Sequence, residues 1–374
     1  MEAFVVSARK YRPATFDEVV GQPSIVGTLK NAIRSGQVAQ AFLFCGPRGV
    51  GKTTCARILA KTINCQNLTK DIEPCNECES CTSFNSGQSL NVYELDAASN
   101  NSVEDIRNLV NQVRIAPQIG TKKAYVIDEV HMLSQSAFNA FLKTLEEPPA
   151  HAVFILATTE KHKILPTILS RCQVFQFNRI TVNDIALHLE GIAKKENIAY
   201  ESEALHIIAQ KADGGLRDAL SIFDQLVTFS NKNLTYQSVI SSLNVLDSDY
   251  YFKATDFLLK KNIPEILLLL NEVIDKGFDE HNFILGLGEH FRNLLLCKNA
   301  ATTHIIETSE KNKALYLEQT AKCSDDLLLC GLEITNDTDI QYKSSKNKRL
   351  LVELCLLKLC SDNLAELKKK SFAD

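Results

Sequence analysis

Residues 46–53 read Gly46-Pro47-Arg48-Gly49-Val50-Gly51-Lys52-Thr53. This stretch has the spacing G-x-x-x-x-G-K-[ST] of a phosphate-binding loop, in which glycines allow backbone N–H groups to point at phosphate oxygens. The lysine meets the terminal phosphates, and the threonine hydroxyl is a ligand for Mg²⁺. The stretch therefore predicts a nucleotide site at a turn between a strand and a helix.

Short apolar runs alternate with helical patterns on both sides of this loop, which is typical of a parallel sheet covered by helices. Helices are expected to start near Gly51, near Ser102, where Asp105 completes a capping signal, and near Ser134. The predicted strands are residues 41–45, 91–95, 123–127, 152–157 and 173–177.

The sequence predicts three domains. The first is an α/β domain over 1–179, with a metal module inserted at 65–81. From 180 to 242 the pattern becomes wholly helical, which predicts a small helical lid domain. Residues 243–374 stay helical but are rich in leucine, as at 350–359. Helices that are apolar on most of their circumference belong in a bundle interior or at a subunit contact.

Composition is that of a water-soluble protein of about two or three domains. The 374 residues are 45% hydrophobic, and the formal net charge is −4. This charge gives no general attraction to nucleic acid, so contact with DNA would need a local basic patch. Charged residues interrupt the first positions, and no uncharged stretch reaches the roughly 18 residues of a membrane span. We expect a cytoplasmic protein without a signal peptide or a membrane contact.

Two carboxylates, Asp128 and Glu129, follow the predicted strand 123–127. Ligands of open α/β sheets bind at the carboxyl ends of the strands. We therefore expect Asp128 to hold Mg²⁺ and Glu129 to polarise the water that attacks the terminal phosphate. Thr158 and Thr159 end the next strand at the same edge. Thr158 is predicted to orient this water, with Thr159 as the close alternative.

Two arginines lie outside the loop but fit its chemistry. Arg171 follows a short helical turn at the rim of the α/β domain, too far along to face the phosphates of its own chain easily. Such a position suggests an arginine finger that is supplied to a neighbour's nucleotide. The alternative is a surface arginine that pairs with an acid. Arg217 lies in the first turn of a lid helix, from which it would reach the γ-phosphate and make the lid angle depend on the nucleotide.

Four cysteines follow the phosphate-binding loop, namely Cys65, Cys75, Cys78 and Cys81. Four thiolates at these short spacings favour tetrahedral Zn²⁺. An iron–sulfur cluster is the competitor, because C-x-x-C-x-x-C also occurs in ferredoxins, although the chain has no evident redox partner. The expected role of the metal is to fold a module that has few apolar residues of its own. The eight other cysteines are scattered, and we predict no disulfides.

The chain resembles the gamma/tau subunits of bacterial DNA polymerase III, the AAA+ ATPases of the sliding-clamp loader. The resemblance covers nearly all of the sequence and rests on many motifs in the same order. They are Arg9-Lys10-Tyr11-Arg12-Pro13, Val20-Gly21-Gln22, the phosphate-binding loop, the four cysteines, residues 95–99, Asp128-Glu129-Val130-His131-Met132-Leu133, residues 142–149, Ser170-Arg171-Cys172 and residues 215–221.

The resemblance implies roles for particular residues. Tyr11, Arg12 and Val20 would frame the adenine and ribose of ATP, Arg171 would be the finger acting on a neighbouring subunit, and Arg217 would be the lid sensor. The set predicted to bind ATP is Tyr11, Arg12, Val20, Gly46, Gly49, Val50, Gly51, Lys52, Thr53, Thr54 and Arg217. The set predicted to act in hydrolysis is Lys52, Asp128, Glu129, Thr158, Arg171 and Arg217, with Thr53 and Asp128 as ligands of Mg²⁺.

The resemblance also implies a function within an assembly. The chain would be the ATPase of the clamp loader in the DNA polymerase III holoenzyme, and its last helical domain would form a collar that joins five subunits, several of them copies of this chain. ATP would drive opening of a sliding clamp and its loading onto primer-template DNA. The family's long form carries further C-terminal parts, whereas this sequence ends at Asp374, as expected of the short form or of a shortened chain.

Two other functions remain open at this point. His131 within Asp128-Glu129-Val130-His131 invites comparison with DExH helicases, which need a second α/β domain. A scaffold that binds nucleotide only to hold partners together would not need an intact acid pair and two arginines. DNA contacts are predicted only loosely, from a helix at 102–114 and from cations at Arg107, Arg114, Lys122, Lys123 and Lys143.

Overall fold

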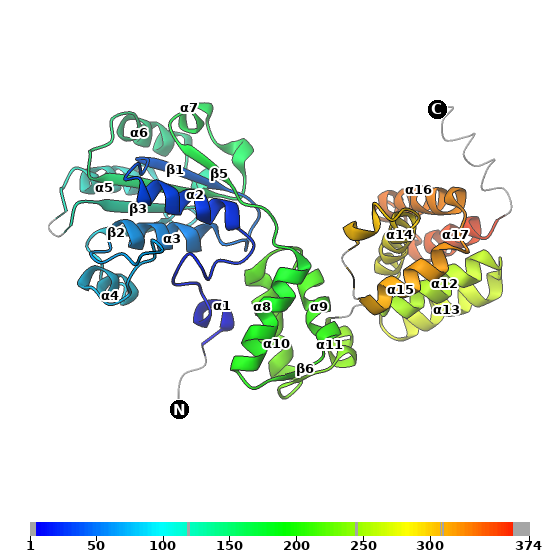
Figure 1. Ribbon diagram of the computed structural model, residues 1–374. Coiled ribbons are helices and arrows are strands. Elements are labelled where there is room, and N and C mark those ends of the chain that lie inside the picture. The colour runs from blue at the N-terminus through cyan, green and yellow to red at the C-terminus, as the bar shows by residue number, and fades with distance from the viewer. Residues whose placement is uncertain (1–4, 118–119, 244–245, 307, 309, 362–374) are drawn as a thin grey trace. The chain divides into compact units, whose positions relative to one another are not determined.

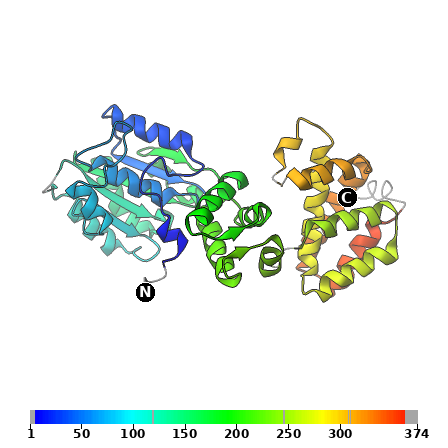
Figure 2. The same ribbon diagram turned by 60° about the horizontal axis from the view of Figure 1, so that its bottom comes forward.

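The computed structural model of the protein describes residues 5–117, 120–243, 246–306, 308 and 310–361. These residues form two compact units (Figures 1 and 2). The first contains the described residues up to 198 together with 208–231, and the second contains 199–207 together with the described residues from 232 onward. Each helix in the described part of the chain is too short or too polar to traverse a lipid bilayer.

A five-stranded parallel sheet organises the first unit, in the order β2-β3-β4-β1-β5. Each predicted strand is confirmed to within one residue at either end. The strands are β1 Ala41–Cys45, β2 Val92–Asp96, β3 Lys123–Asp128, β4 Ala152–Thr158 and β5 Gln173–Gln176.

Helices cover both faces of this sheet, as Figure 1 shows. Side chains alternate along each strand, so that Phe42 and Phe44 of β1 pack on one side with helices α2 and α3, while Leu43 and Cys45 pack on the other with α5 and α6. Both faces are therefore apolar, which explains the continuous hydrophobic runs of the strands. The helices and 3₁₀ turns of this unit are α1 Ser7–Lys10, α2 Pro23–Arg34, α3 Lys52–Ile63, α4 Glu79–Asn85, α5 Val103–Val113, η1 Val130–Met132, α6 Gln135–Glu146, η2 Lys161–Lys163, α7 Pro166–Leu169, α8 Val182–Lys195 and α10 Leu216–Phe229.

The predicted helix starts are also confirmed. Ser102 accepts a hydrogen bond from the backbone of Asp105, whose side chain bonds back to the Ser102 N–H, so that a capping box opens α5. Ser134 caps α6 through a single hydrogen bond, which its hydroxyl accepts from the Ala137 backbone N–H. These local signals satisfy backbone N–H groups that have no partner within the helix.

The second unit is mainly helical. Its elements are β6 Ala199–Tyr200, the start of α9 Ser202–Lys211, β7 Asn233–Leu234, α11 Tyr236–Leu243, α12 Ser248–Leu259, α13 Ile263–Asp275, α14 Glu280–Cys297, η3 Thr303–Ile305, α15 Glu310–Thr320, α16 Asp325–Tyr342 and α17 Lys348–Leu359. The prediction that 181–242 is wholly helical is wrong at β6 and β7, which pair in parallel. A strand of two residues is too short to show any periodicity. The pairing of β6 with β7 also joins loops that lie far apart in the sequence, so no local pattern indicates it. The described residues after 180 contain no second large sheet, as a helicase would require.

The domain boundaries drawn from the sequence stay predictions. The compact units divide the predicted lid segment 180–242 between them, with α8 and α10 in the first unit and α11 in the second. Residues 244–245, 307, 309 and 362–374 of the predicted C-terminal domain lie outside the described residues.

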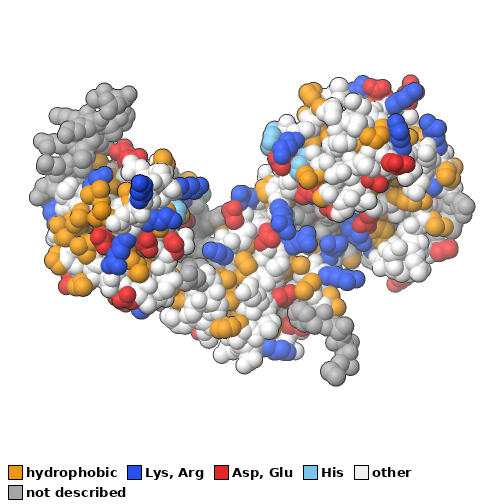
Figure 3. Space-filling view, turned by 180° about the vertical axis from the view of Figure 1, so that it is seen from behind, with side chains coloured by type: hydrophobic (Ala, Val, Ile, Leu, Met, Phe, Trp, Pro, Cys, Tyr) orange, Lys and Arg blue, Asp and Glu red, His pale blue; other side chains and the backbone are white. Residues whose placement is uncertain are grey.

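The C-terminal helices enclose a hydrophobic core of their own. They also leave apolar side chains at the surface, and Figure 3 shows hydrophobic groups gathered on one face of this unit. Leu268, Ile340 and Leu350 are each more than half exposed. Exposed leucine and isoleucine in such number are typical of a surface that contacts another protein.

Candidate nucleotide-binding site

The phosphate-binding loop connects β1 to α3, as the spacing predicts. Gly46 has φ 149°, and a Cβ atom there would lie 2.5 Å from the carbonyl oxygen of Phe177. Gly51 has φ 102°, a conformation that L-amino acids rarely adopt. Both positions thus require glycine, one because of close packing and the other because of its backbone angle.

Lys52 is buried at the start of α3. Its Nζ donates hydrogen bonds to the carbonyl oxygens of Gly46 (2.8 Å) and Pro47 (2.7 Å), so the side chain curls over the loop. Burial lowers the pKa of the ammonium group, and the carboxylates of Glu129 and Asp128 oppose this effect. The result is a cation placed among loop groups that would face phosphates.

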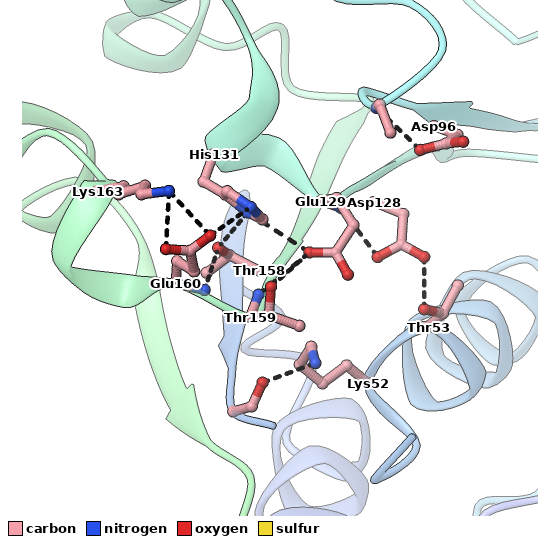
Figure 4. Close-up of polar contacts among 12 residues, drawn as sticks. Lys52, Thr53, Asp96, Asp128, Glu129, His131, Thr158, Thr159, Glu160 and Lys163 are labelled. Atoms are coloured by element: carbon pink, nitrogen blue, oxygen red, sulfur yellow. Dashed lines mark hydrogen bonds and ion pairs between the residues drawn. The ribbon is translucent and has the colours of Figure 1, made fainter. Parts of the chain in front are cut away.

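Thr53 and Asp128 meet across the loop. Thr53 Oγ1 donates a hydrogen bond of 2.7 Å to Asp128 Oδ2 at the end of β3 (Figure 4). A hydroxyl and a carboxylate are hard oxygen ligands of the kind that Mg²⁺ accepts. The donor set therefore fits the predicted ion, with other positions left for phosphate oxygens and water.

Glu129 is held in a strained backbone position directly after Asp128. Its φ is 46°, in the left-handed region, and such strain in a residue other than glycine often marks a functional site. Its Oε2 accepts hydrogen bonds from the backbone N–H (3.2 Å) and the hydroxyl (3.0 Å) of Thr159. The carboxylate lines the same pocket as the loop.

The two threonines at the end of β4 have different surroundings. Thr158 is fully buried, and its hydroxyl lies 3.0 Å from His131 Nδ1 while accepting a hydrogen bond from the Glu160 N–H. Only Thr159 contacts Glu129 (Figure 4). The role given to Thr158 stays a prediction, but the geometry favours the alternative, Thr159.

One pocket brings together most of the residues predicted to bind ATP. It is lined by Tyr11, Arg12, Val20, Gly49, Val50, Gly51, Lys52, Thr53, Thr54, Asp128, Glu129 and Arg217. It also contains residues that were not assigned to the ATP site from the sequence, namely Ala8, Pro13, Val19, Arg48, Ile180, Leu216 and Leu220. Pro13, Arg48, Leu216 and Leu220 lie within the quoted motifs, whereas Ala8, Val19 and Ile180 are apolar residues outside them that no short motif identifies.

The N-terminal segment forms one wall of this pocket. The Tyr11 hydroxyl hydrogen-bonds Glu196, and both burial and this contact raise the pKa of the phenol. Burial, followed by repulsion from Arg57 and Arg217, lowers the pKa of Arg12. Several guanidinium groups thus share a partly buried space, which suits the binding of a polyanion.

Arg217 reaches the pocket because α10 begins against the phosphate-binding loop. A Cβ atom at Gly49 would lie 3.2 Å from the Cα of Gly215, and a Cβ atom at Gly215 would lie 3.3 Å from the Arg48 carbonyl oxygen. The Arg217 N–H donates to the Gly49 carbonyl oxygen (3.4 Å). The close approach of the two backbones explains Gly215, whereas Gly214 has φ 79° and packs against Arg179.

Arg171 lies apart from the residues that line the pocket. Its guanidinium donates to Glu146 Oε1 (2.8 Å) and to the Thr167 carbonyl oxygen (2.7 Å). The side chain does not face the nucleotide site of its own chain, in agreement with the sequence reasoning. The contact with Glu146 is also the arrangement expected of the alternative, a surface ion pair.

The four cysteines of the inserted module converge. Their Sγ atoms all lie within 4.8 Å of one another. The backbone N–H groups of Cys75 and Cys78 donate to the sulfurs of Cys65 and Cys75, both at 3.3 Å. Burial opposes ionisation of Cys78, but hydrogen bonds from the backbone of Gln66 and Cys81 lower its pKa to about 6. Converging sulfurs with N–H donors fit a tetrahedral thiolate site for a metal ion.

Other polar groups considered in the sequence have structural partners. Lys123 is buried, and its ammonium lies over the ring of Tyr93 (5.6 Å), so it is not available for contact with DNA phosphate. Lys122 donates to the Ala150 carbonyl oxygen (2.9 Å). His151, which follows α6, bonds the Val113 carbonyl oxygen (2.9 Å) and so has a structural partner as well.

A parallel α/β sheet, a phosphate-binding loop, an acid pair and a helical segment that supplies Arg217 together define a nucleotide-binding protein of the AAA+ class. This fold implies a bound nucleotide and Mg²⁺.

Two family models match the chain and together cover most of its first 232 residues. The model of the DNA polymerase III delta subunit matches residues 21–181, and that of the clamp-loader subunit ATPase lid domain matches residues 184–232.

Curated relatives identify the family. The chain is 36% identical over 369 residues to DNA polymerase III subunit gamma of Buchnera aphidicola subsp. Baizongia pistaciae. This alignment covers 96% of this chain and 97% of that protein. It is 42% identical over 352 residues to subunit tau of Bacillus subtilis, covering 94% of this chain and 62% of tau. It is 43% identical over 278 residues to subunit tau of Escherichia coli, and this alignment covers 74% of this chain and 43% of the length of tau. The chain belongs to the gamma/tau subunit family of DNA polymerase III and spans less than two thirds of these tau subunits.

Proposed function

We propose that the chain is the ATPase motor subunit of a replicative clamp loader, which uses ATP to open a sliding clamp and load it onto primed DNA. One observation carries this proposal. The loop, the acid pair, the Tyr11–Arg12 segment and Arg217 line a single pocket, whereas Arg171 lies outside it. One chain thus supplies the groups proposed to bind phosphate, Mg²⁺ and water, but it places no arginine finger in its own pocket. This arrangement suits an ATPase whose site is completed by an arginine from a neighbouring subunit.

Within one chain, the proposed roles follow from the contacts. Lys52 and the backbone of the loop would hold the phosphates, and Thr53 with Asp128 would hold Mg²⁺, which neutralises charge on the phosphate oxygens. Glu129 would orient the attacking water and accept its proton. Thr159 holds the Glu129 carboxylate (3.0 Å from its hydroxyl) and would set its direction, while Thr158 bonds His131 and the Glu160 N–H beside it.

Between chains, Arg171 would leave Glu146 and reach the ATP of the next subunit. Arg217 would contact the γ-phosphate from the lid side, so that ATP binding and lid position depend on each other. The exposed apolar side chains of the C-terminal unit support a role as the collar that joins five subunits, several of them this chain. The other partners would be the clamp and primer-template DNA, within the DNA polymerase III holoenzyme in the cytoplasm.

The cysteine module would hold Zn²⁺ through Cys65, Cys75, Cys78 and Cys81. All four ligand positions are filled by protein sulfurs, which fits a structural rather than a catalytic metal. An iron–sulfur cluster remains the alternative to test.

We expect ATP hydrolysis by the reconstituted complex to rise at least tenfold when clamp and primer-template DNA are added together. Hydrolysis before DNA is bound would release the clamp without loading it, so the step should depend on both partners. Steady-state phosphate release measures this directly. Absence of any stimulation would favour a scaffold that binds nucleotide without acting as a motor.

Lys52→Ala removes the buried cation from the loop. It should weaken ATP binding about a hundredfold, which corresponds to the loss of one or two charge-assisted hydrogen bonds.

Metal analysis of the purified chain should find one zinc per chain and no iron. Removal of the metal by a chelator should expose residues 65–81 to protease, because this module has little core of its own. Iron with a visible charge-transfer absorption would overturn the assignment of zinc. A chain that keeps its protease resistance after complete metal removal would contradict the structural role.

A further inference from the structure

Through a buried carboxylate, the inserted metal module contacts the segment that leads to Val20, a pocket residue expected to frame the purine. Glu73 lies in the loop between Cys65 and Cys75 and is only 7% exposed. Its Oε2 accepts a hydrogen bond from the Phe16 N–H (2.7 Å), and its Oε1 accepts one from the Asp17 N–H (3.1 Å). A charged acceptor that binds two backbone donors is stronger than a neutral one.

The position of Glu73 is determined from two directions. Its backbone closes a short turn with Thr69, through Thr69 N–H to the Glu73 carbonyl oxygen (3.0 Å) and Glu73 N–H to Thr69 Oγ1 (3.0 Å). Pro74 separates it from the metal ligand Cys75. Its charge is compensated by Lys30 of α2, which also pairs with Asp17. Glu73 is thus tied on one side to α2 and on the other to the loop that carries Cys75.

The segment that Glu73 holds continues into the pocket. Phe16 is 1% exposed and packs in the core beneath α2 and α3. The Val19 N–H donates to the Phe16 carbonyl oxygen (3.1 Å), which closes a turn. Val19 and Val20 then line the pocket. The two hydrogen bonds from Glu73 fix the start of the turn that places these two valines.

Helix α3 completes the connection from the other side. It begins with Lys52 at the phosphate-binding loop and ends at Ile63, two residues before the metal ligand Cys65. The phosphate side of the pocket and the purine side thus both lead to the same four sulfurs, one through a helix and the other through Glu73.

We propose that the metal module braces the nucleotide pocket, and that Glu73 is the positioning residue through which metal binding strengthens ATP binding. This inference rests on the proposed zinc and ATP sites and adds a link between them. With metal bound, the loop 66–74 holds Glu73 against Phe16 and Asp17, and Val19 and Val20 keep their places around the purine. Without metal, the carboxylate is no longer held there, and the wall formed by these residues loosens.

The first test uses the full chain carrying Glu73→Gln with its metal retained. Hydrogen exchange of the Phe16 and Asp17 amides should become at least tenfold faster, and ATP affinity measured by calorimetry should fall about tenfold, since an uncharged acceptor holds these amides less strongly. Asp71→Asn is the matched control, because it removes the same charge from an exposed side chain of the same loop, and it should leave both quantities unchanged. Lys30→Met removes the partner of Glu73 without altering the module and should act in the same direction.

The second test is a cycle of metal removal and mutation. Chelation should weaken ATP binding about tenfold in the unmodified chain but less than twofold further in Glu73→Gln, because the link is already broken. Equal losses in both chains would overturn the role of Glu73, as would normal amide protection in a metal-loaded Glu73→Gln protein. If the unmodified chain binds no ATP, the proposed function fails instead, and the exchange of the two amides on chelation still decides whether the module holds this segment.

Discussion

Arg171→Ala is expected to lower ATP hydrolysis by the assembled complex about a thousandfold, the typical contribution of an arginine finger, while ATP binding to the isolated chain stays within about twofold. The reason is geometric. Arg171 bonds Glu146 and Thr167 and does not line the pocket of its own chain, so its loss removes nothing from nucleotide binding there. Single-turnover hydrolysis in the presence of clamp and DNA separates this effect from slow product release.

Glu146→Gln provides the matched control for this variant. It breaks the intrachain ion pair but leaves the guanidinium available to a neighbour. If Arg171 acts on the adjacent ATP, Glu146→Gln should retain near-normal turnover. A loss in Glu146→Gln as large as that in Arg171→Ala would show that the ion pair merely holds the rim of the domain, and unchanged turnover in Arg171→Ala would remove the finger assignment altogether.

Glu129→Gln is expected to reduce hydrolysis roughly a thousandfold and to keep ATP bound, so that the loader remains on primed DNA with the clamp. The amide has nearly the same shape as the carboxylate, and one oxygen can still accept from Thr159. What is lost is the negative charge and the ability to take a proton from water. Fluorescence anisotropy of labelled primer-template DNA would follow the release of the complex over time.

Glu160→Gln tests whether this effect is specific. Both carboxylates lie within reach of His131, at 3.4 Å for Glu129 and 3.2 Å for Glu160, but only Glu129 lines the pocket. The Glu160 variant should therefore release DNA at a rate much closer to that of the unmodified complex. Normal release by Glu129→Gln would contradict its role as the base.

Local features of the site could be predicted because their signals are short. The loop spacing, the acid pair after an apolar strand and the capping residues Ser102 and Ser134 each act within a few positions, and the structure places all of them as expected. The parallel sheet was also predicted, from short apolar runs that alternate with helical patterns, whereas the strand order came only from the structure.

The choice between neighbouring residues could not be made in this way. Thr158 and Thr159 look equivalent in sequence, but alternate side chains of a strand end point in opposite directions. The first is buried against His131 and the second bonds Glu129. The paired strands β6 and β7 were missed for a related reason, since a contact between two distant loops has no local pattern.

For this protein, then, the order of residues alone determined the class of site, the strand that carries each acid and the presence of a four-sulfur cluster. The tertiary structure decided what joins them: that the N-terminal segment forms a wall of the pocket, that Gly49 and Gly215 let the start of α10 approach the loop, and that Glu73 links the cysteine module to Phe16 and Asp17. The physical reason is range. Helix and strand signals arise from the chemistry of near neighbours, whereas a hydrogen bond between a carboxylate and an amide far away in the chain exists only after packing has brought them together.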